Sequence, residues 1–302
     1  MRFGIMAMQI DSLIPAEARL LPPDQAIARI LGFDHSGLVR QLASQGFDPI
    51  ELGGDLSMLL PHTYSAAAIE KLAEVKAELG LSFTLHLPLW SVEPSSLLLP
   101  IRQGSVQVLV DMIHLTQPLL PEVYVLHATG ALAAEFYHMQ IPEMARAILM
   151  RQFQSGARQS LQTILSETGL PSRKLAIETV EFPFDLTLQL ADELDLSMCL
   201  DTGHVLAGFS GYIGLDEALE RCLPRLANIH LHDCPWQGPQ HNLGYGKDHQ
   251  PLGKGDLDVA HFLGRLMAAD YRGPIIFELR LDEALASMEV IKKLRPDALN
   301  TP

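Results

Sequence analysis

The sequence predicts a single-domain α/β fold, a (β/α)8 or TIM barrel, over residues 1–302. Short apolar runs alternate with longer amphipathic stretches from one end of the chain to the other. Eight such pairs are present, and eight strand–helix units are the number that closes a parallel sheet into a barrel. The length of 302 residues is normal for this fold, and no repeat or linker divides the chain.

Each predicted strand is short and rich in branched or aromatic residues. In chain order the predicted strands are Phe3–Gln9, Pro49–Leu52, Ser82–Leu87, Val123–His127, Leu175–Glu178, Ser197–Leu200, Ala227–Leu231 and Pro274–Leu279. A segment with helical periodicity follows each of them. The predicted helices are His35–Gln45, Ala66–Leu79, Ser105–Gln117, Pro142–Thr168, Leu186–Leu194, Leu215–Leu223, Val259–Ala269 and Asp282–Arg295. Glycine supports several of these ends, for example Gly80 and Gly169.

Two predicted connections are unusually long. Asp11–Asp34 follows the first strand, and Asp233–Asp258 follows the seventh. Both lie on the side of the barrel where enzymes of this architecture build their active sites. Because long loops in a compact domain are usually functional, we expect these two to shape a substrate pocket.

The amino-acid composition narrows the classes of molecule that the protein is expected to bind and the setting in which it is expected to work. A net charge of −14 disfavours binding to duplex nucleic acid or to an anionic membrane through the general field of the protein. Three cysteines without CxxC spacing predict neither a disulfide framework nor a thiolate zinc site, which favours a cytoplasmic setting. The opening residues MRFGIMAMQI are typical of a strand rather than a signal peptide, and no apolar run approaches the length of a membrane span.

Histidines, carboxylates and one arginine gather at the carboxyl ends of the third to eighth predicted strands. They are His86, His127, Glu178, Asp201, His204, His230, His232, Glu278 and Arg280, and His249 lies in the long loop after the seventh strand. A single strand-end histidine is more often a hydrogen-bonded structural residue than a ligand. Six successive strand ends that meet at one rim of a closed barrel instead predict a metal centre, because imidazole nitrogen and carboxylate oxygen are ligands for zinc, manganese and iron. Among the other histidines, His241 shares the long loop with His249.

Three segments, LDTGH, IHLHD and DHQPLGKG, resemble motifs of the xylose isomerase-like barrel superfamily (AP endonuclease family 2), and within it the branch typified by endonuclease IV. The resemblance extends from the first to the eighth strand. It implies two or three divalent metal ions per chain, with zinc as the first expectation and manganese or iron as alternatives. A narrower resemblance, in ETVEFPF, CLDTGH and HLHD, is to the cobamide-remodelling phosphodiesterases of the same superfamily.

Carried over residue by residue, the resemblance implies three metal positions. The first would be held by His86, His127 and Glu178. The second would use Glu178 as a bridge, together with Asp201, His230 and Glu278. The third would use His204 and His249. The family pattern has an aspartate two residues before the loop histidine, where this chain has Lys247, so Asp248 is the candidate substitute and a dinuclear site is the alternative.

The activity that this resemblance implies is metal-dependent hydrolysis of a small-molecule phosphodiester, a phosphoribosyl-type bond such as that of a cobamide. Two ions can clamp the attacking and leaving oxygens of a phosphoryl displacement. Glu178 and Glu278 are the predicted catalytic carboxylates. Arg280 and Lys247 are the predicted ligands of a phosphate oxygen. The residues predicted to orient the metal ligands from behind are His232, Asp233 and Asp248.

Two other functions stay open at this point. The first is a sugar or polyol isomerase or epimerase with one metal, held by Glu178, Asp201, His230 and Glu278. Its two glutamates would exchange a proton at a carbon beside a carbonyl, and His86, His127 and His249 would have little to do. The second is a non-catalytic barrel that binds and retains a metallated or phosphorylated ligand. In each case the expected partner is a small molecule.

Overall fold

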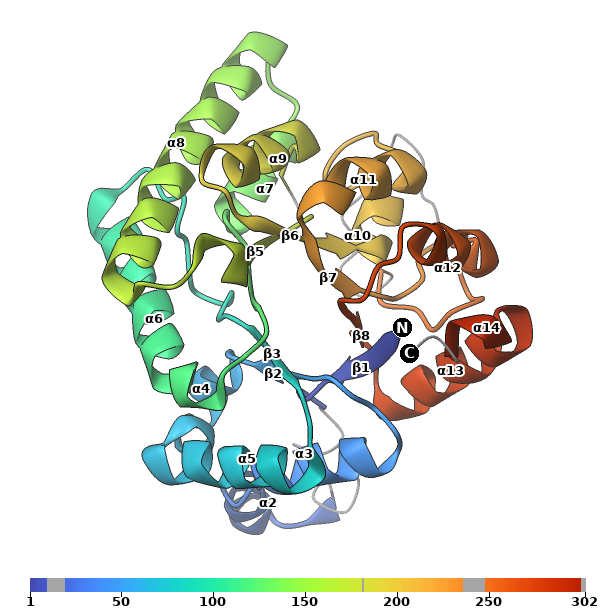
Figure 1. Cartoon of the computed structure of the whole chain (residues 1–302). Coiled ribbons are helices and arrows are strands. Elements are labelled where there is room, and N and C mark those ends of the chain that lie inside the picture. Colours follow the sequence, from blue (N-terminus) through green and yellow to red (C-terminus); the bar gives the residue numbers. More distant parts are fainter. Residues whose placement is uncertain (10–19, 181, 236–247, 300–302) are drawn as a thin grey trace.

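A closed barrel of eight parallel strands in the order β1 to β8 forms the centre of the molecule, and the larger helices surround it (Figure 1). The computed structural model describes residues 1–9, 20–180, 182–235 and 248–299. The strands are β1 Arg2–Met6, β2 Ile50–Gly53, β3 Phe83–His86, β4 Tyr124–Leu126, β5 Leu175–Glu178, β6 Ser197–Asp201, β7 Leu226–His230 and β8 Pro274–Phe277. The predicted (β/α)8 barrel is therefore confirmed.

The helices follow the strands in the alternation that the sequence predicts. Their bounds are α2 Pro23–Leu31, α3 His35–Ser44, α4 Leu56–Leu59, α5 Ala66–Leu79, α6 Leu99–Thr116, α7 Ala131–His138, α8 Glu143–Thr168, α9 Phe184–Glu193, α10 Thr202–Ala207, α11 Leu215–Cys222, α12 Val259–Ala268, α13 Leu281–Leu294 and α14 Pro296–Leu299. Helix α6 begins six residues before the predicted start at Ser105, because Pro100 occupies its first turn, where proline is tolerated. Helices α2, α4, α7, α10 and α14 were not predicted, and α2 lies within the segment predicted as the connection Asp11–Asp34.

Local signals explain several helix ends. The side chain of Ser65 accepts a hydrogen bond from the backbone N–H of Ala68 and caps the start of α5. The same helix ends at Gly80, whose φ of 67° lies in the left-handed region. Helix α8 ends in the same way at Gly169, with φ of 63°. These ends match the predicted ones because they depend only on residues close in sequence.

The strand register brings the carboxyl ends of the strands to one rim. His86 at the end of β3 pairs with Val125 of β4, and Asp201 at the end of β6 pairs with His230 of β7. All residues of β5 and β6 are buried, as expected for parallel strands covered on both faces. The rim therefore carries polar side chains that the barrel and its loops largely shield from water.

No helix in the described ranges is both long enough and apolar enough to cross a membrane. This agrees with the absence of a long apolar run in the sequence.

Candidate metal centre

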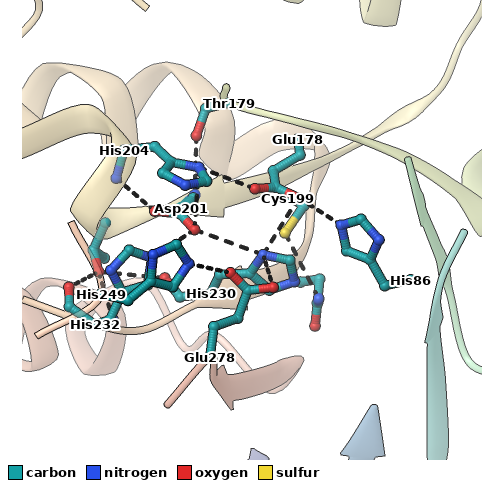
Figure 2. A network of polar contacts seen from close by, with 12 residues as sticks. His86, Glu178, Thr179, Cys199, Asp201, His204, His230, His232, His249 and Glu278 are labelled. Carbon is teal, nitrogen blue, oxygen red and sulfur yellow. Dashed lines mark hydrogen bonds and ion pairs between the residues drawn. The ribbon is translucent and has the colours of Figure 1, made fainter. Parts of the chain in front are cut away.

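Four side chains from neighbouring strand ends converge on one point at the rim of the barrel (Figure 2). We call this set the metal tetrad, and it consists of Glu178, Asp201, His230 and Glu278. One ligand atom from each of the four lies within 4.8 Å of the others. Nδ1 of His230 is the common neighbour, at 3.4 Å from Oε2 of Glu178, 3.7 Å from Oδ2 of Asp201 and 3.3 Å from Oε1 of Glu278. The structure thus assembles the four residues that both enzymatic hypotheses require.

Glu178 is also the meeting point of three further histidines. Nε2 of His86 lies 3.1 Å from Oε2 of Glu178, and Nε2 of His127 lies 3.2 Å from the same oxygen. Nδ1 of His204 lies 3.1 Å from the other oxygen, Oε1. His86, His127 and Glu178 form a second group whose ligand atoms lie within 4.8 Å of one another.

A third group lies beside the tetrad and includes the loop after β7. His204, His232 and His249 each offer a ring nitrogen within 4.8 Å of the others, and the rings of His232 and His249 stack at 4.2 Å. Oδ2 of Asp248 lies 2.9 Å from Nδ1 of His249 and 3.4 Å from Nε2 of His204. Asp248 therefore contacts both histidines with which it was predicted to act, His204 and His249.

The surrounding imidazoles set the charge of the carboxylates. Burial by itself would raise the pKa of Glu178, but His230 and His127 outweigh it and hold that pKa well below its usual value. Burial likewise opposes ionisation of Glu278, yet His230 and His249 lower its pKa to about 2. The carboxylates are therefore ionised, and they require positive charge that protons on the imidazoles or a bound cation can supply.

The residues present fit a divalent cation. Within the described part of the chain, neither ring nitrogen of His230 makes a hydrogen bond, although Nδ1 faces three carboxylates. Three carboxylates and one imidazole are a donor set suited to manganese, iron or zinc. A cation among them would satisfy the orphaned nitrogen and offset the concentrated negative charge.

The residues predicted to orient the metal ligands, and Arg280, which was predicted to bind phosphate, make different contacts. Nε2 of His232 lies 2.9 Å from Oδ2 of Asp201, and its Nδ1 makes a short contact with the backbone carbonyl of Asp248. Asp233 contacts backbone N–H groups of the following loop. Arg280 has a half-exposed side chain that pairs with Asp282 at 3.1 Å. Lys247 and His241 lie outside the described residues.

Asp233 organises the part of the seventh loop that carries His249. It is fully buried, and its Oδ1 accepts hydrogen bonds from the N–H groups of Cys234 and Leu257, each at 2.9 Å. Its Oδ2 accepts from Gly253 and Gly255, also at 2.9 Å. A Cβ at position 255 would lie 2.4 Å from Oδ1 of Asp233, so the close approach requires glycine there.

A buried carboxylate that was not predicted lies next to the tetrad. Oε1 of Glu51, on β2, lies 3.0 Å from Nε2 of His230, and both side chains are fully buried. Cys199 of β6 also lies beside His230 and groups with Glu178 as a candidate ligand set (Figure 2). The available signal for Glu51 is its position in IELG, where a carboxylate interrupts an otherwise apolar strand that is buried throughout.

Solved structures of similar fold cover almost the whole chain. A D-tagatose 3-epimerase-like protein matches with 19% identity and a TM-score of 0.71 over 99% of each chain. A 3-keto-D-glucoside 4-epimerase from E. coli matches with 15% identity and a TM-score of 0.65 over 98% of this chain and 99% of the other. A D-psicose 3-epimerase from Clostridium cellulolyticum H10 matches with 13% identity and a TM-score of 0.66 over 97% and 99%. At these identities the likeness establishes the fold alone. No curated protein matches the chain significantly.

The predicted phosphodiester hydrolase is wrong, because the structural neighbours are sugar epimerases and agree with the alternative function. That prediction depended on the histidines beyond the tetrad. In the structure His86, His127 and His204 contact the single carboxylate Glu178, and such contacts do not by themselves require a second metal. The phosphate-binding roles of Arg280 and Lys247 depended on the same substrate. A cobamide-remodelling phosphodiesterase is not supported either.

A family comparison covers most of the barrel. The model described as xylose isomerase-like TIM barrel matches residues 39–294, which include β2 to β8 and the whole metal tetrad. The superfamily suggested by LDTGH, IHLHD and DHQPLGKG is thereby confirmed. The chain belongs to the xylose isomerase-like TIM barrel family.

Proposed function

We propose that this chain is a metal-dependent isomerase or epimerase that acts on a sugar or a related polyol-derived carbonyl compound. The observation that carries the proposal is the metal tetrad, which combines a one-ion donor set with two glutamates that both lie beside Nδ1 of His230. The epimerase names of the structural neighbours point in the same direction.

The tetrad residues would hold one divalent cation. When bound, the cation would polarise the carbonyl of the substrate and so acidify the neighbouring C–H bond. Glu178 and Glu278 would then work on that carbon: one carboxylate takes the proton, and the other delivers a proton that it has first taken up from solvent. Both carboxylates are ionised at neutral pH, because the neighbouring imidazoles lower their pKa values. Either can therefore accept a proton.

The charge of the site favours an uncharged substrate. The tetrad carries three carboxylates, so one divalent cation leaves it with a negative charge. Within the described ranges, no lysine or arginine forms an ion pair with a tetrad member. A neutral sugar meets less electrostatic opposition here than a phosphorylated one does.

The direct test is proton exchange in D2O. The purified protein, loaded in turn with Mn²⁺, Co²⁺ and Zn²⁺, is incubated with a panel of ketopentoses and ketohexoses. We expect deuterium to appear at a carbon next to the carbonyl in ¹H NMR spectra, together with an epimer or aldose product on chromatography. A metallated protein that exchanges no C–H proton with any sugar of the panel would contradict the proposal.

Substitution of His127 distinguishes a centre with one metal ion from a centre with two or three. Its side chain is one-fifth exposed and it is not a member of the tetrad. We expect His127→Ala to retain one divalent ion per chain in elemental analysis, because all four tetrad ligands remain. His261→Ala, which removes an exposed histidine paired with Asp216, is the matched control. Loss of the only tightly bound ion in His127→Ala would instead assign the metal to the group of His86, His127 and Glu178.

A further inference from the structure

We propose that Glu51 is a positioning residue of the metal centre. It holds the imidazole of His230 in the tautomer with the proton on Nε2, which turns the lone pair of Nδ1 toward the three carboxylates of the tetrad. This inference rests on the metal site of the proposed function, but not on the reaction assigned to that site.

The first observation is a layer of polar side chains one level below the rim. We call it the polar layer, and it consists of Glu51, Thr84, Cys199 and Asn228, all of them fully buried. Glu51 pairs with Thr84 in the register of β2 and β3, and Cys199 pairs with Asn228 in the register of β6 and β7. Thr84, Cys199 and Asn228 each lie two residues before a histidine or aspartate of the rim, so they face the same way as that residue. Bulky branched side chains ordinarily fill this part of a barrel. A buried polar layer that contains a carboxylate therefore indicates a specific role for these residues.

The second observation is how the carboxylate of Glu51 is bound. Its Oε2 accepts hydrogen bonds from the hydroxyl of Thr84 at 2.8 Å and from the amide of Asn228 at 3.0 Å. Its Oε1 lies 3.0 Å from Nε2 of His230. In the part of the chain that the structure describes, no lysine or arginine pairs with Glu51. Thr84 and Asn228 therefore satisfy Oε2, and His230 is the polar side chain beside Oε1.

The two ring nitrogens of His230 therefore face different partners. Oε1 of Glu51 lies 3.0 Å from Nε2, in an orientation that does not make a hydrogen bond in this structure, and a proton on Nε2 would have this oxygen as its nearby acceptor. Nδ1, on the other side of the ring, lies 3.3 to 3.7 Å from Glu178, Asp201 and Glu278. A ring with its proton fixed on Nε2 offers the lone pair of Nδ1 to a cation, and the neighbouring carboxylate makes that nitrogen a stronger ligand.

The neutral side chains of the polar layer hold Glu51 in position and are not themselves proposed as metal ligands. Thr84 and Asn228 both bind Oε2, which leaves Oε1 as the oxygen that faces the imidazole. The amide of Asn228 also lies 3.6 Å from the sulfur of Cys199. The layer thus presents one defined oxygen of Glu51, Oε1, to the imidazole of His230.

The test measures binding of Mn²⁺ to the full chain after removal of metal by a chelator, with free Mn²⁺ followed by electron paramagnetic resonance. Glu51→Leu, which removes the charge and both oxygens, is expected to raise the Kd for Mn²⁺ by about 10- to 100-fold. Glu51→Gln keeps an oxygen that can accept from Nε2, so its Kd should lie between those of Glu51→Leu and the unchanged protein. Thr116→Val is the matched control, because Thr116 is equally buried but bonds to backbone carbonyls of α6 and to Tyr124, away from the rim. Its Kd should not change.

A second readout reports the tautomer directly. In protein labelled with ¹⁵N at histidine and loaded with Zn²⁺, the resonances that a His230→Gln variant lacks identify this ring. We expect a protonated Nε2 in the unchanged protein and in Glu51→Gln, and loss of that fixed tautomer in Glu51→Leu. The proposal is overturned if Glu51→Leu binds Mn²⁺ with unchanged Kd and shows the same His230 resonances. If circular dichroism shows that Glu51→Leu does not fold, an unchanged Mn²⁺ Kd in Glu51→Gln overturns it. Neither measurement uses a substrate, so failure of the sugar-exchange assay would leave this result intact, and the reverse also holds.

Discussion

Glu278→Gln is expected to lower kcat for sugar isomerisation or epimerisation by roughly 10²- to 10⁴-fold, which is the usual contribution of a positioned acid–base group. Glutamine has nearly the same shape as glutamate but cannot accept a proton at neutral pH. Glu278 is contacted by His230 and His249, whereas four imidazoles surround Glu178. Glu178→Gln should therefore reduce kcat at least as much and should weaken metal binding more.

Two measurements separate loss of the base from loss of the metal. Turnover of each variant is followed at saturating Mn²⁺, and the bound metal is counted after gel filtration. Glu289→Gln is the matched control, because Glu289 is an exposed glutamate that pairs with Lys292 on α13. A Glu278→Gln variant that carries its metal and keeps the original kcat would show that this carboxylate does not move the proton.

Asp233→Ala is expected to lower the free energy of unfolding by about 3 to 5 kcal/mol, because it leaves buried N–H groups without an acceptor. Four backbone N–H groups bond to this one carboxylate, and they belong to residues spread over the seventh loop. Asp233 also forms a backbone bridge with Gln250, next to His249. The variant should therefore lose activity together with stability. Urea denaturation followed by circular dichroism, with turnover measured in parallel, checks both effects.

Asp258→Ala provides the comparison within the same loop. Asp258 caps α12 and accepts one N–H, that of His261, in an exposed position. Its loss should cost about 1 kcal/mol, as is usual for a helix cap, and should leave activity unchanged. If Asp233→Ala were no more destabilising than Asp258→Ala, the buried carboxylate would not be organising the loop.

The sequence was sufficient for most of the fold, because strands and helices leave a local periodic pattern. The predicted end of α5 coincides with the observed one, since Ser65 and Gly80 mark its two ends. Some missed helices are too short to show a period, for example α10 with six residues, whereas α2 has nine and lies within the segment predicted as the long connection Asp11–Asp34. The convergence of Glu178, Asp201, His230 and Glu278 was also predictable, because parallel strands of a closed barrel end at one rim.

The choice between hydrolase and isomerase was not predictable from the same residues. Both hypotheses use the tetrad, and the extra histidines favour a second metal only until their contacts are known. The substrate depends on the rim loops, where residue type says little about the shape of the pocket. Two of the segments in these loops, 10–19 and 236–247, lie outside the described residues.

What the sequence by itself determined is the barrel, its eight strands and the set of polar residues at their carboxyl ends. Only the tertiary structure decided which atoms of that set meet, and it added Glu51, which is far in sequence from the His230 that it contacts. It also assigned Asp233 to the loop rather than to the metal ligands. The physical reason is that periodicity reports which face of a strand a residue lies on, whereas a contact between β2 and β7 exists only across the interior of the closed barrel.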